Sequence, residues 1–390
     1  MATPLMIVGD GPLEPTGLGR IARDLCGLIA ESDLPVDLVQ VGGTQPPVWR
    51  GGWPAYPLNP DNDDWGRAQV EAYYRDCFGD RPGVVWLIWD PARLVAYLRP
   101  TLPVQWWAYT AVDAENVHCG MSGPAGEAVR AFDRVLAYGR WGSQILRTAR
   151  GRTVPYLPHG IMPATYQTPP TVEEADWVTQ TLGPYRGTRW LLGAVATNQP
   201  RKDLGWFAQT LRALLDDGQT VYGWLHTDTL VKHQGQVGWA LPQLILDLGL
   251  AHDLTITTGT LTDRQLALLY QACTVTLAPG LGEGFGYPIV ESLASGTPVI
   301  HHTYGGGAEL IPRSEWRVPV AAWRLDGLYA LKRPVLTAVD GRNAVLRARQ
   351  LRRDDPSLPA YCQGAVAHLA WPQLWPYWQQ WIRRGLEGGR

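Results

Sequence analysis

The stretch LAPGLGEGFGYPIVESLASGTPVIHHTYGGGAELIP, residues 277–312, combines the signals of a strand, a glycine-rich turn and a helix. Apolar residues precede the turn, and Pro288 is typical of the first turn of a helix, where a missing N–H group costs nothing. Anions bind well at such a helix start, because the helix dipole and the unpaired N–H groups both favour negative charge. The turn contains four glycines at alternate positions: Gly280, Gly282, Gly284 and Gly286. The stretch therefore predicts an α/β fold with a binding site for a diphosphate.

The strand–loop–helix pattern continues on both sides of this stretch. Uninterrupted apolar strands separated by helical segments indicate parallel sheets that are covered on both faces. Upstream, strands are expected at 5–10, 35–43, 83–90, 103–113, 133–141 and within 153–161. The pattern restarts with strands expected at 188–198, 221–227, 254–260, 274–280 and 297–302. Two successive arrays of this kind predict two Rossmann-like, doubly wound domains, with the ligand in a cleft between them.

A chain of 390 residues is also longer than one hydrophobic core usually serves, which again favours two domains. We place an N-terminal domain, expected to bind an acceptor, at residues 1–170. A C-terminal domain, expected to bind a donor, follows at 171–371. The aromatic-rich segment at about 372–390 predicts a terminal helix that returns to the first domain.

The composition excludes several classes of protein. The formal net charge is -2, so the chain as a whole has no electrostatic attraction to nucleic acid or an anionic membrane. The five cysteines include no CxxC pair, which disfavours both a disulfide framework and a structural zinc site. The opening residues do not resemble a signal peptide, and no apolar run is long enough to span a membrane. We therefore expect a cytoplasmic protein without an integral membrane segment.

Glu283 in the turn and Glu291 in the following helix are separated by seven residues, and we expect both to face one pocket. A carboxylate can accept hydrogen bonds from a pair of hydroxyl groups, such as those of a sugar or a ribose. The segment EGFGYPIVESLASGTPVI, 283–300, resembles the Glu-x7-Glu signature of retaining GT-B glycosyltransferases of family four. The resemblance covers nearly the whole chain and is strongest over about 190–312 and the first 30 residues. It implies that Glu283 contacts a donor sugar and Glu291 the ribose of its nucleotide.

The resemblance also implies a nucleotide-sugar co-substrate, no other cofactor and no metal. The remaining donor contacts are expected in the glycine-rich turn, at Gly282, Gly284, Phe285 and Gly286. The acidic run at 61–64 is interpreted as a surface turn rather than a metal site.

Arg201 and Lys202 follow the strand expected at 188–198 and precede a helix. Two cations at the carboxyl end of a strand are well placed to neutralise a leaving diphosphate. They resemble the Arg and Lys pair with that role in the family, whereas an ordinary solvated basic turn is the alternative. Asn198, at the end of the same strand, is assigned to the donor site with them.

Gly17 and Gly19 begin a helix directly after the first strand. They resemble the loop whose backbone amides approach the donor phosphate in the family, although turns and caps use glycine equally often. Many family members have a His at the end of the fourth strand, where this chain has Asp113. This residue is expected either to contact the sugar or acceptor or to cap the following helix.

His118, His159 and Trp107 are further candidates for contacts with the acceptor or sugar. Acceptor loops are expected around 49–65 and 86–115, which include several tryptophans.

The sequence leaves the acceptor open: a glycan, a lipid, a small molecule or modified DNA. The main prediction is a metal-independent retaining transferase that uses a UDP- or GDP-sugar. A phage-type DNA glycosyltransferase acting on a hydroxymethylated base is an alternative, because tryptophans can stack on bases. A nucleotide-sugar 2-epimerase and a non-catalytic nucleotide-sugar binding protein are the alternatives from other classes.

Overall fold

The computed structural model describes residues 2–43, 52–59, 64–98, 101–183, 186–228, 232–233, 236–327 and 330–388. The chain divides into two compact units. The first unit consists of Met1–His159 and Trp371–Arg390, and the second unit is Gly160–Ala370. The predicted boundary at residue 170 falls after this division, because helix α6 (Pro163–Gln167) packs on helix α10 (Asp263–Ala272) of the second unit.

The first unit contains a six-stranded parallel sheet in the order β3-β2-β1-β4-β5-β6. This is the order of a doubly wound sheet, and the direction of winding reverses between β1 and β4. In place of the short strand expected within 153–161, the segment forms two isolated bridges, from Tyr156 to Ala137 and from Ile161 to Ala370, and it contains Pro155 and Pro158. The strands are β1 (Thr3–Val8), β2 (Val36–Val41), β3 (Ala55–Tyr56), β4 (Val84–Ile88), β5 (Gln105–Thr110) and β6 (Arg134–Ala137).

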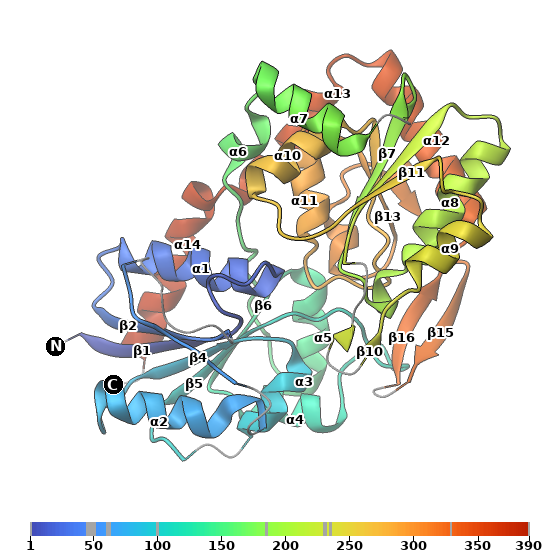
Figure 1. The fold of residues 1–390 in the computed structure, drawn as a ribbon. Helices are drawn as coiled ribbons and strands as arrows, with labels where there is room; N and C mark the ends of the chain where they lie inside the picture. Colours follow the sequence, from blue (N-terminus) through green and yellow to red (C-terminus); the bar gives the residue numbers. More distant parts are fainter. Residues whose placement is uncertain are drawn as a thin grey trace. The chain divides into compact units, whose positions relative to one another are not determined.

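Helices cover both faces of the first unit's sheet. Figure 1 shows α1 and α14 on one face and α2 on the other. Successive strand residues point to opposite faces, so Val85 and Leu87 join the core under α2, α4 and α5, whereas Trp86 faces α14. The helices are α1 (Gly17–Ala30), α2 (Arg67–Phe78), α3 (Pro91–Leu94), α4 (Gly123–Ala131), α5 (Arg140–Arg150) and α14 (Trp371–Glu387).

Many of the chain's tryptophans fill the core. Trp86, Trp107 and Trp378 are fully buried, and their rings meet between the sheet and α14. The indole N–H group of Trp378 donates a hydrogen bond to the carbonyl of Pro158, 3.0 Å away. The terminal helix thus belongs to the first unit and completes its core.

The second unit repeats the same topology. Its six parallel strands follow the order β11-β8-β7-β12-β13-β14, with the reversal between β7 and β12. Helices α7 and α10 share one core with β7 and β8, and α8 packs against α12. The strands are β7 (Trp190–Val195), β8 (Val221–His226), β11 (Leu254–Thr257), β12 (Val275–Leu277), β13 (Val299–His302) and β14 (Arg317–Val318).

The other elements of the second unit surround this sheet. Two small hairpins, β9 with β10 and β15 with β16, lie outside it. The helices are α7 (Val172–Leu182), α8 (Leu204–Asp216), α9 (Leu241–Asp247), α11 (Tyr287–Ala294), α12 (Ala338–Asp354) and α13 (Leu358–Val366). The hairpin strands are β9 (Lys232–His233), β10 (Gln236–Val237), β15 (Ala322–Asp326) and β16 (Leu331–Val335). Every helix in the described part of the chain is too short or too polar to cross a bilayer.

The packing of α14 yields a stability prediction. Trp378→Ala removes a fully buried ring and should lower the free energy of unfolding by about 3–5 kcal/mol. The neighbouring Tyr377 is 62% exposed, so Tyr377→Ala is a matched control with little expected effect. Chemical denaturation of both variants measures the difference, and equal losses would contradict the packing described.

Candidate functional site

The reversal between β7 and β12 places two loops side by side at the carboxyl ends of these strands. Ligands of doubly wound sheets bind at this point. The segment after β7 leads to the short 3-10 helix Pro200–Lys202, and β12 leads into the glycine-rich loop 280–286. The Arg201 carbonyl accepts a hydrogen bond from the N–H group of Leu281, 2.7 Å away, which joins the two loops directly.

Three of the residues predicted from separate parts of the sequence come together here. The Nζ atom of Lys202 lies 2.5 Å from Oε1 of Glu283. The guanidinium of Arg201 lies 4.0 Å from the other oxygen of Glu283 and donates to the Gly282 carbonyl at 3.2 Å. The Lys202 and Glu283 side chains are mostly buried, and Coulomb interactions are stronger there than in water. The group therefore holds two cations beside one carboxylate that accepts hydrogen bonds.

Glycine is required in this loop because the backbone makes very close contacts. A Cβ atom at Gly280 would lie 2.2 Å from Oε1 of Glu283, so the Glu283 carboxylate rests directly on the Gly280 backbone. A Cβ atom at Gly306 would lie 2.5 Å from the Gly284 carbonyl oxygen. The N–H group of Gly306 donates to the Glu283 carbonyl at 2.9 Å. The conformation of the loop is thus fixed from several sides.

The loop ends at the N-terminus of α11, as predicted. Gly286 precedes the helix with a φ of 107°, a conformation that side chains strongly disfavour. The first turn has no acidic residue and no side-chain cap. Pro288 has no N–H group and Ile289 donates its own to the Gly286 carbonyl at 3.0 Å, so it is mainly the helix dipole that favours an anion at this end. Phe285, which is buried, packs edge-to-face on Tyr287. A pocket at this position is lined by residues of both loops, among them Ala196, Gly280, Glu283, Gly286 and Pro288.

Glu291 has a different set of partners. It is 4% exposed, and its two carboxylate oxygens accept hydrogen bonds from the hydroxyl groups of Tyr166 at 3.2 Å and Tyr270 at 3.1 Å. Burial and the nearby Glu291 carboxylate raise the pKa of Tyr270 well above 10, so Tyr270 stays a hydrogen-bond donor. The two tyrosine hydroxyls thus hold the Glu291 carboxylate at both of its oxygens.

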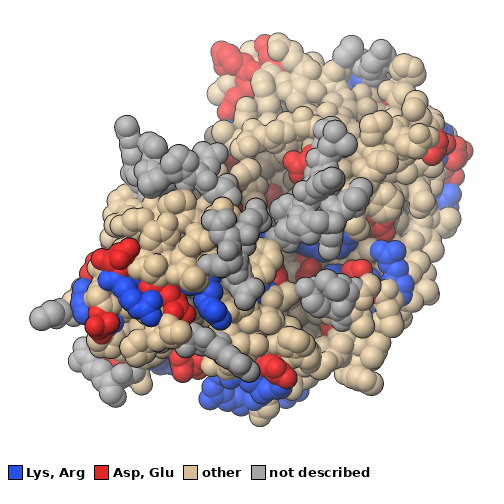
Figure 2. All heavy atoms as spheres, turned by 60° about the horizontal axis from the view of Figure 1, so that its bottom comes forward, with Lys and Arg blue, Asp and Glu red and all other residues tan. Residues whose placement is uncertain are grey.

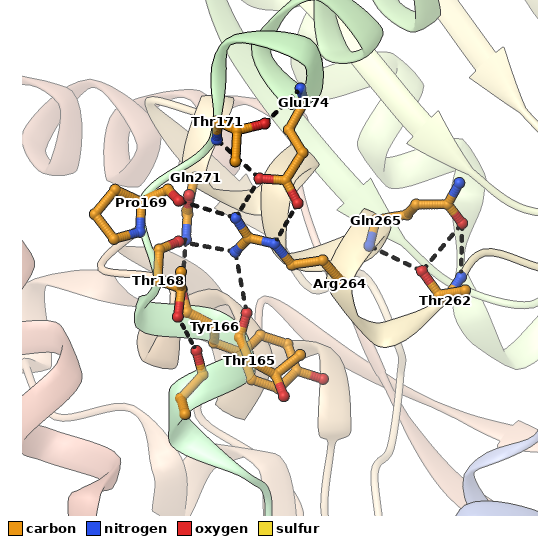
Figure 3. Close-up of polar contacts among 11 residues, drawn as sticks. Thr165, Tyr166, Thr168, Pro169, Thr171, Glu174, Thr262, Arg264, Gln265 and Gln271 are labelled. Atoms are coloured by element: carbon orange, nitrogen blue, oxygen red, sulfur yellow. Dashed lines mark hydrogen bonds and ion pairs between the residues drawn. The ribbon is translucent and has the colours of Figure 1, made fainter.

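Tyr166 itself is held by a polar network (Figure 3). Arg264 of α10 pairs with the Glu174 carboxylate at 2.6 Å and donates to the carbonyl groups of Thr165, Thr168 and Pro169. Gln271, two turns further along α10, donates to the Tyr166 carbonyl at 2.6 Å. The segment 165–169 is thereby fixed on α10, with the Tyr166 hydroxyl directed at Glu291.

Two histidines that the sequence analysis did not select lie beneath the loop. His301 and His302 are fully buried at the end of β13, and they bond to the carbonyls of Ala278 at 2.8 Å and Gly280 at 2.6 Å. Burial lowers the pKa of His301 to about 4 and the pKa of His302 well below 6.5, so both rings are neutral near pH 7. The sequence does contain a signal for them, because two adjacent polar residues end a strand that is otherwise apolar.

Two other residues predicted to contact the donor, Asn198 and Gly19, form hydrogen bonds to residues of the protein itself. Both ends of the buried Asn198 amide bond to the backbone of Trp239, at 2.7 and 3.0 Å. The N–H group of Gly19 donates to the Thr16 hydroxyl that caps α1, at 2.9 Å, while Gly17 is exposed at the first position of the helix. These contacts indicate that Asn198 and Gly19 stabilise loops. Of these three residues, Gly17 is the exposed one.

In the first unit, Asp113 follows β5 and is partly buried. It does not cap the next helix, because α4 begins ten residues later, after Ser122. Desolvation raises the pKa of Asp90, the Arg93 guanidinium opposes that shift, and the Asp113 carboxylate adds to it. Asp90 and Asp113 therefore lie close enough to interact at the carboxyl ends of β4 and β5.

The remaining acceptor candidates lie in different environments. His118 is exposed in a turn, where its backbone N–H group donates to the Asn116 side chain at 2.9 Å. His159 is 1% exposed and bonds to the Tyr109 hydroxyl at 2.9 Å, and burial lowers its pKa well below 6.5. Trp107 is fully buried under α14. Trp107 and His159 are thus core residues in this structure, which does not support a sugar contact by either.

A second cluster that the sequence analysis missed lies at the reversal between β1 and β4. Oδ1 of Asp10 accepts hydrogen bonds from Arg93 at 3.2 Å and from the Trp89 indole at 3.3 Å. The Arg93 guanidinium stacks over the Trp65 ring, 4.7 Å from its centroid. Arg93, Trp89 and Trp65 lie within the expected acceptor ranges 49–65 and 86–115, whereas Asp10 lies outside them. Residues 44–51 and 60–63, which include most of the acidic run at 61–64, lie outside the described residues.

Comparisons with known proteins find a family match within the second unit. The model of the family described as glycosyl transferases group 1 matches residues 189–323, which include Arg201, Lys202, Glu283 and Glu291. The chain is similar to MMP alpha-(1->4)-mannosyltransferase of Mycolicibacterium hassiacum, with 39% identity over 112 residues, 28% of this chain and 25% of the relative. It is also 32% identical over 131 residues to D-inositol 3-phosphate glycosyltransferase of Corynebacterium diphtheriae, 33% of this chain and 26% of that protein. These matches span about a quarter of each relative's length.

Solved structures extend the similarity of fold to the whole chain. Sucrose-phosphate synthase from Thermosynechococcus elongatus superposes with a TM-score of 0.77 at 15% identity, covering 99% of this chain and 100% of that one. Anabaena HepE in complex with UDP superposes with a TM-score of 0.68 at 17% identity, with 99% and 100% covered. The fold is therefore the two-domain α/β fold of GT-B proteins, as the sequence predicted. Among the described residues, no group of three or more His, Cys, Asp or Glu side chains is arranged to hold a metal ion.

The network of Figure 3 predicts a pH dependence of stability. The bond with Arg264 lowers the pKa of Glu174 from 4.5 to about 2. The stability that this pair contributes is present above pH 4.5 and is lost as the pH falls toward 2. Glu174→Gln should therefore lower the melting temperature at pH 7, and its difference from the wild type should shrink between pH 4.5 and 2.

Asp176→Asn is the control, because Asp176 is an exposed carboxylate on the same helix. Thermal unfolding followed by circular dichroism across this pH range measures the effect. A difference between Glu174→Gln and the wild type that does not change with pH would contradict it.

Proposed function

We propose that this protein is a glycosyltransferase that transfers a sugar from a nucleotide-diphosphate donor to a hydroxyl group, with retention of configuration and without a metal ion. The observation that carries the proposal is the group of Arg201, Lys202 and Glu283 at the N-terminus of α11. Cations and the positive end of a helix dipole suit a diphosphate, and the carboxylate suits sugar hydroxyls. The family match over residues 189–323 supports the same assignment.

In the proposed reaction, the bond between the anomeric carbon and the diphosphate oxygen breaks first. Arg201, Lys202 and the first turn of α11 stabilise the charge that develops on the leaving diphosphate. The acceptor hydroxyl attacks on the face from which the diphosphate leaves, and its proton passes to an oxygen of the leaving phosphate. The new glycosidic bond then has the configuration of the old one, and no side chain of the protein acts as a nucleophile.

Glu283 is proposed to bind the hydroxyl groups of the donor sugar. Donor binding would break the contact between Lys202 and Glu283, because the diphosphate attracts the lysine and the sugar hydroxyls take its place on the carboxylate. Glu291 is proposed to accept hydrogen bonds from the ribose hydroxyls while the two tyrosines hold it in place.

The donor is proposed to be a UDP- or GDP-sugar. UDP is the nucleotide that the HepE complex contains, and one of the similar relatives is a mannosyltransferase. For the acceptor we propose the cluster of Asp10, Arg93 and Trp65 with Asp113 as the place of recognition, because it lies at the strand reversal of the first unit. Its carboxylates, guanidinium and indole ring suit a polyhydroxylated compound.

A DNA acceptor has less support. On the face shown in Figure 2, Lys and Arg residues are interspersed with Asp and Glu and do not form a continuous basic surface. Binding to DNA draws most of its affinity from phosphate contacts with such a surface. DNA is therefore tested as one possible acceptor.

The experiment measures release of nucleoside diphosphate from UDP-, GDP- and ADP-sugars in the presence of EDTA, with and without hydroxymethylated DNA. We expect release from one donor class that EDTA does not inhibit. Release that depends on DNA would identify the acceptor as a modified base. Analysis of the recovered sugar distinguishes transfer from 2-epimerisation, and no release from any donor would favour a binding protein.

Arg201 gives the sharpest test of the catalytic proposal. Arg201→Ala should lower kcat by about 100-fold, since removal of one electrostatic group from a transition state commonly costs 2.7–4 kcal/mol. Arg212→Ala is the matched control, because Arg212 pairs with Asp216 on the surface of α8 in the same unit. Steady-state kinetics of nucleoside diphosphate release compares them, and an unchanged kcat in Arg201→Ala would contradict the assigned role.

A further inference from the structure

His302 bonds to the loop that carries Glu283. Nε2 of His302 bonds to the Gly280 carbonyl at 2.6 Å, and Nδ1 bonds to the backbone N–H group of Tyr304 at 3.1 Å. A carbonyl oxygen only accepts hydrogen bonds and a backbone N–H group only donates them. The proton of the neutral ring must therefore be on Nε2, and both ring nitrogens are used.

The contact with Gly280 reaches Glu283 through the backbone. The Glu283 carboxylate lies against the Cα atom of Gly280, where a Cβ would come within 2.2 Å of Oε1. If the peptide group of Gly280 rotated, the surface that supports this carboxylate would move. The Leu281 N–H group belongs to the same planar peptide unit as the Gly280 carbonyl, so its bond to the Arg201 carbonyl and the bond from His302 hold this unit from its two sides. The Gly306 N–H group holds the loop further along, at the Glu283 carbonyl.

The surroundings of His302 keep the ring in this state. It is fully buried, and the His301 ring lies beside it, with centroids 4.0 Å apart. Burial and the neighbouring His301 lower the pKa of His302, which outweighs the opposite effect of Glu283. A second proton, on Nδ1, would face the N–H group of Tyr304 and abolish that hydrogen bond. The ring thus acts as a fixed donor and acceptor.

We propose that His302 is a positioning residue for the donor sugar: its Nε2–H group fixes the Gly280 carbonyl, and the backbone so fixed holds the Glu283 carboxylate in place for the sugar hydroxyls. This inference rests on the proposed function and specifies how the same site recognises the sugar. It assigns His302 no contact with the diphosphate. Loss of the Nε2–H donor should therefore weaken binding of a nucleotide sugar more than binding of the nucleoside diphosphate alone.

Two amide substitutions separate the functions of the two ring nitrogens. In His302→Asn the amide group matches the position of Nδ1, so the variant can keep the bond from Tyr304 but has no donor that reaches Gly280. In His302→Gln the amide nitrogen matches the position of Nε2 and can still donate to the Gly280 carbonyl. Tyr222→Phe is the control, because it removes one buried hydrogen bond, to Thr255 at 2.7 Å, elsewhere in the same unit.

The experiment is calorimetric titration of each variant with UDP, UDP-glucose, GDP and GDP-mannose, using the nucleotide pair that the wild type binds. In His302→Asn the Kd for the nucleotide sugar should rise roughly tenfold, as expected for one hydrogen bond, while the Kd for the diphosphate changes by less than about threefold. His302→Gln and Tyr222→Phe should keep the wild-type ratio of the two constants. Rescue by Gln is a result that a merely structural role would not give.

The outcomes distinguish this inference from the proposed function. A wild type that binds none of the four ligands would contradict the proposed function, and the role of His302 with it. A wild type that binds a pair, with an unchanged ratio in His302→Asn, would overturn the role of His302 alone. Equal weakening of both ligands in His302→Asn, or the same loss of selectivity in His302→Gln, would also overturn it.

Discussion

The close approach of the Glu283 carboxylate to the Gly280 backbone is the constraint on which the site depends. No residue with a Cβ fits there without displacing that carboxylate, and Lys202 binds the same oxygen from the other side. Because the carboxylate is mostly buried, its charge needs this lysine, and the buried lysine needs the carboxylate. The strand reversal between β7 and β12 is what brings the two residues within 2.5 Å of each other.

The two glutamates of the site, Glu283 and Glu291, are close in sequence but have different electrostatic surroundings. Two cations surround the first, and two tyrosine hydroxyls bond to the second. A carboxylate balanced by cations can exchange its partner when another anion arrives. A carboxylate bonded to tyrosines keeps a fixed geometry. This difference fits the proposed exchange of partners at Glu283, from the lysine to the sugar hydroxyls, and the proposed fixed contact of Glu291 with the ribose.

Much of the fold could be predicted from the sequence, because apolar strands and periodic helices are local signals. The doubly wound units and the grouping of Arg201, Lys202 and Glu283 follow from strand ends that the sequence marks clearly. The burial of Trp107 could not be predicted, because sequence does not reveal that α14 covers its side of the sheet. His302 was missed because its partner is a backbone carbonyl, and backbone positions leave no trace in residue identities. The use of Asn198 to hold Trp239 was invisible for the same reason.

The most direct measurement is a crystal structure of the protein with the nucleotide sugar that it binds. The account predicts a diphosphate at the N-terminus of α11, in contact with Arg201 and Lys202, and a sugar whose hydroxyl groups bond to Glu283 in place of Lys202. The Gly280 carbonyl should keep its bond to His302. A nucleotide sugar bound elsewhere, or a sugar with no contact to Glu283, would contradict the central claim.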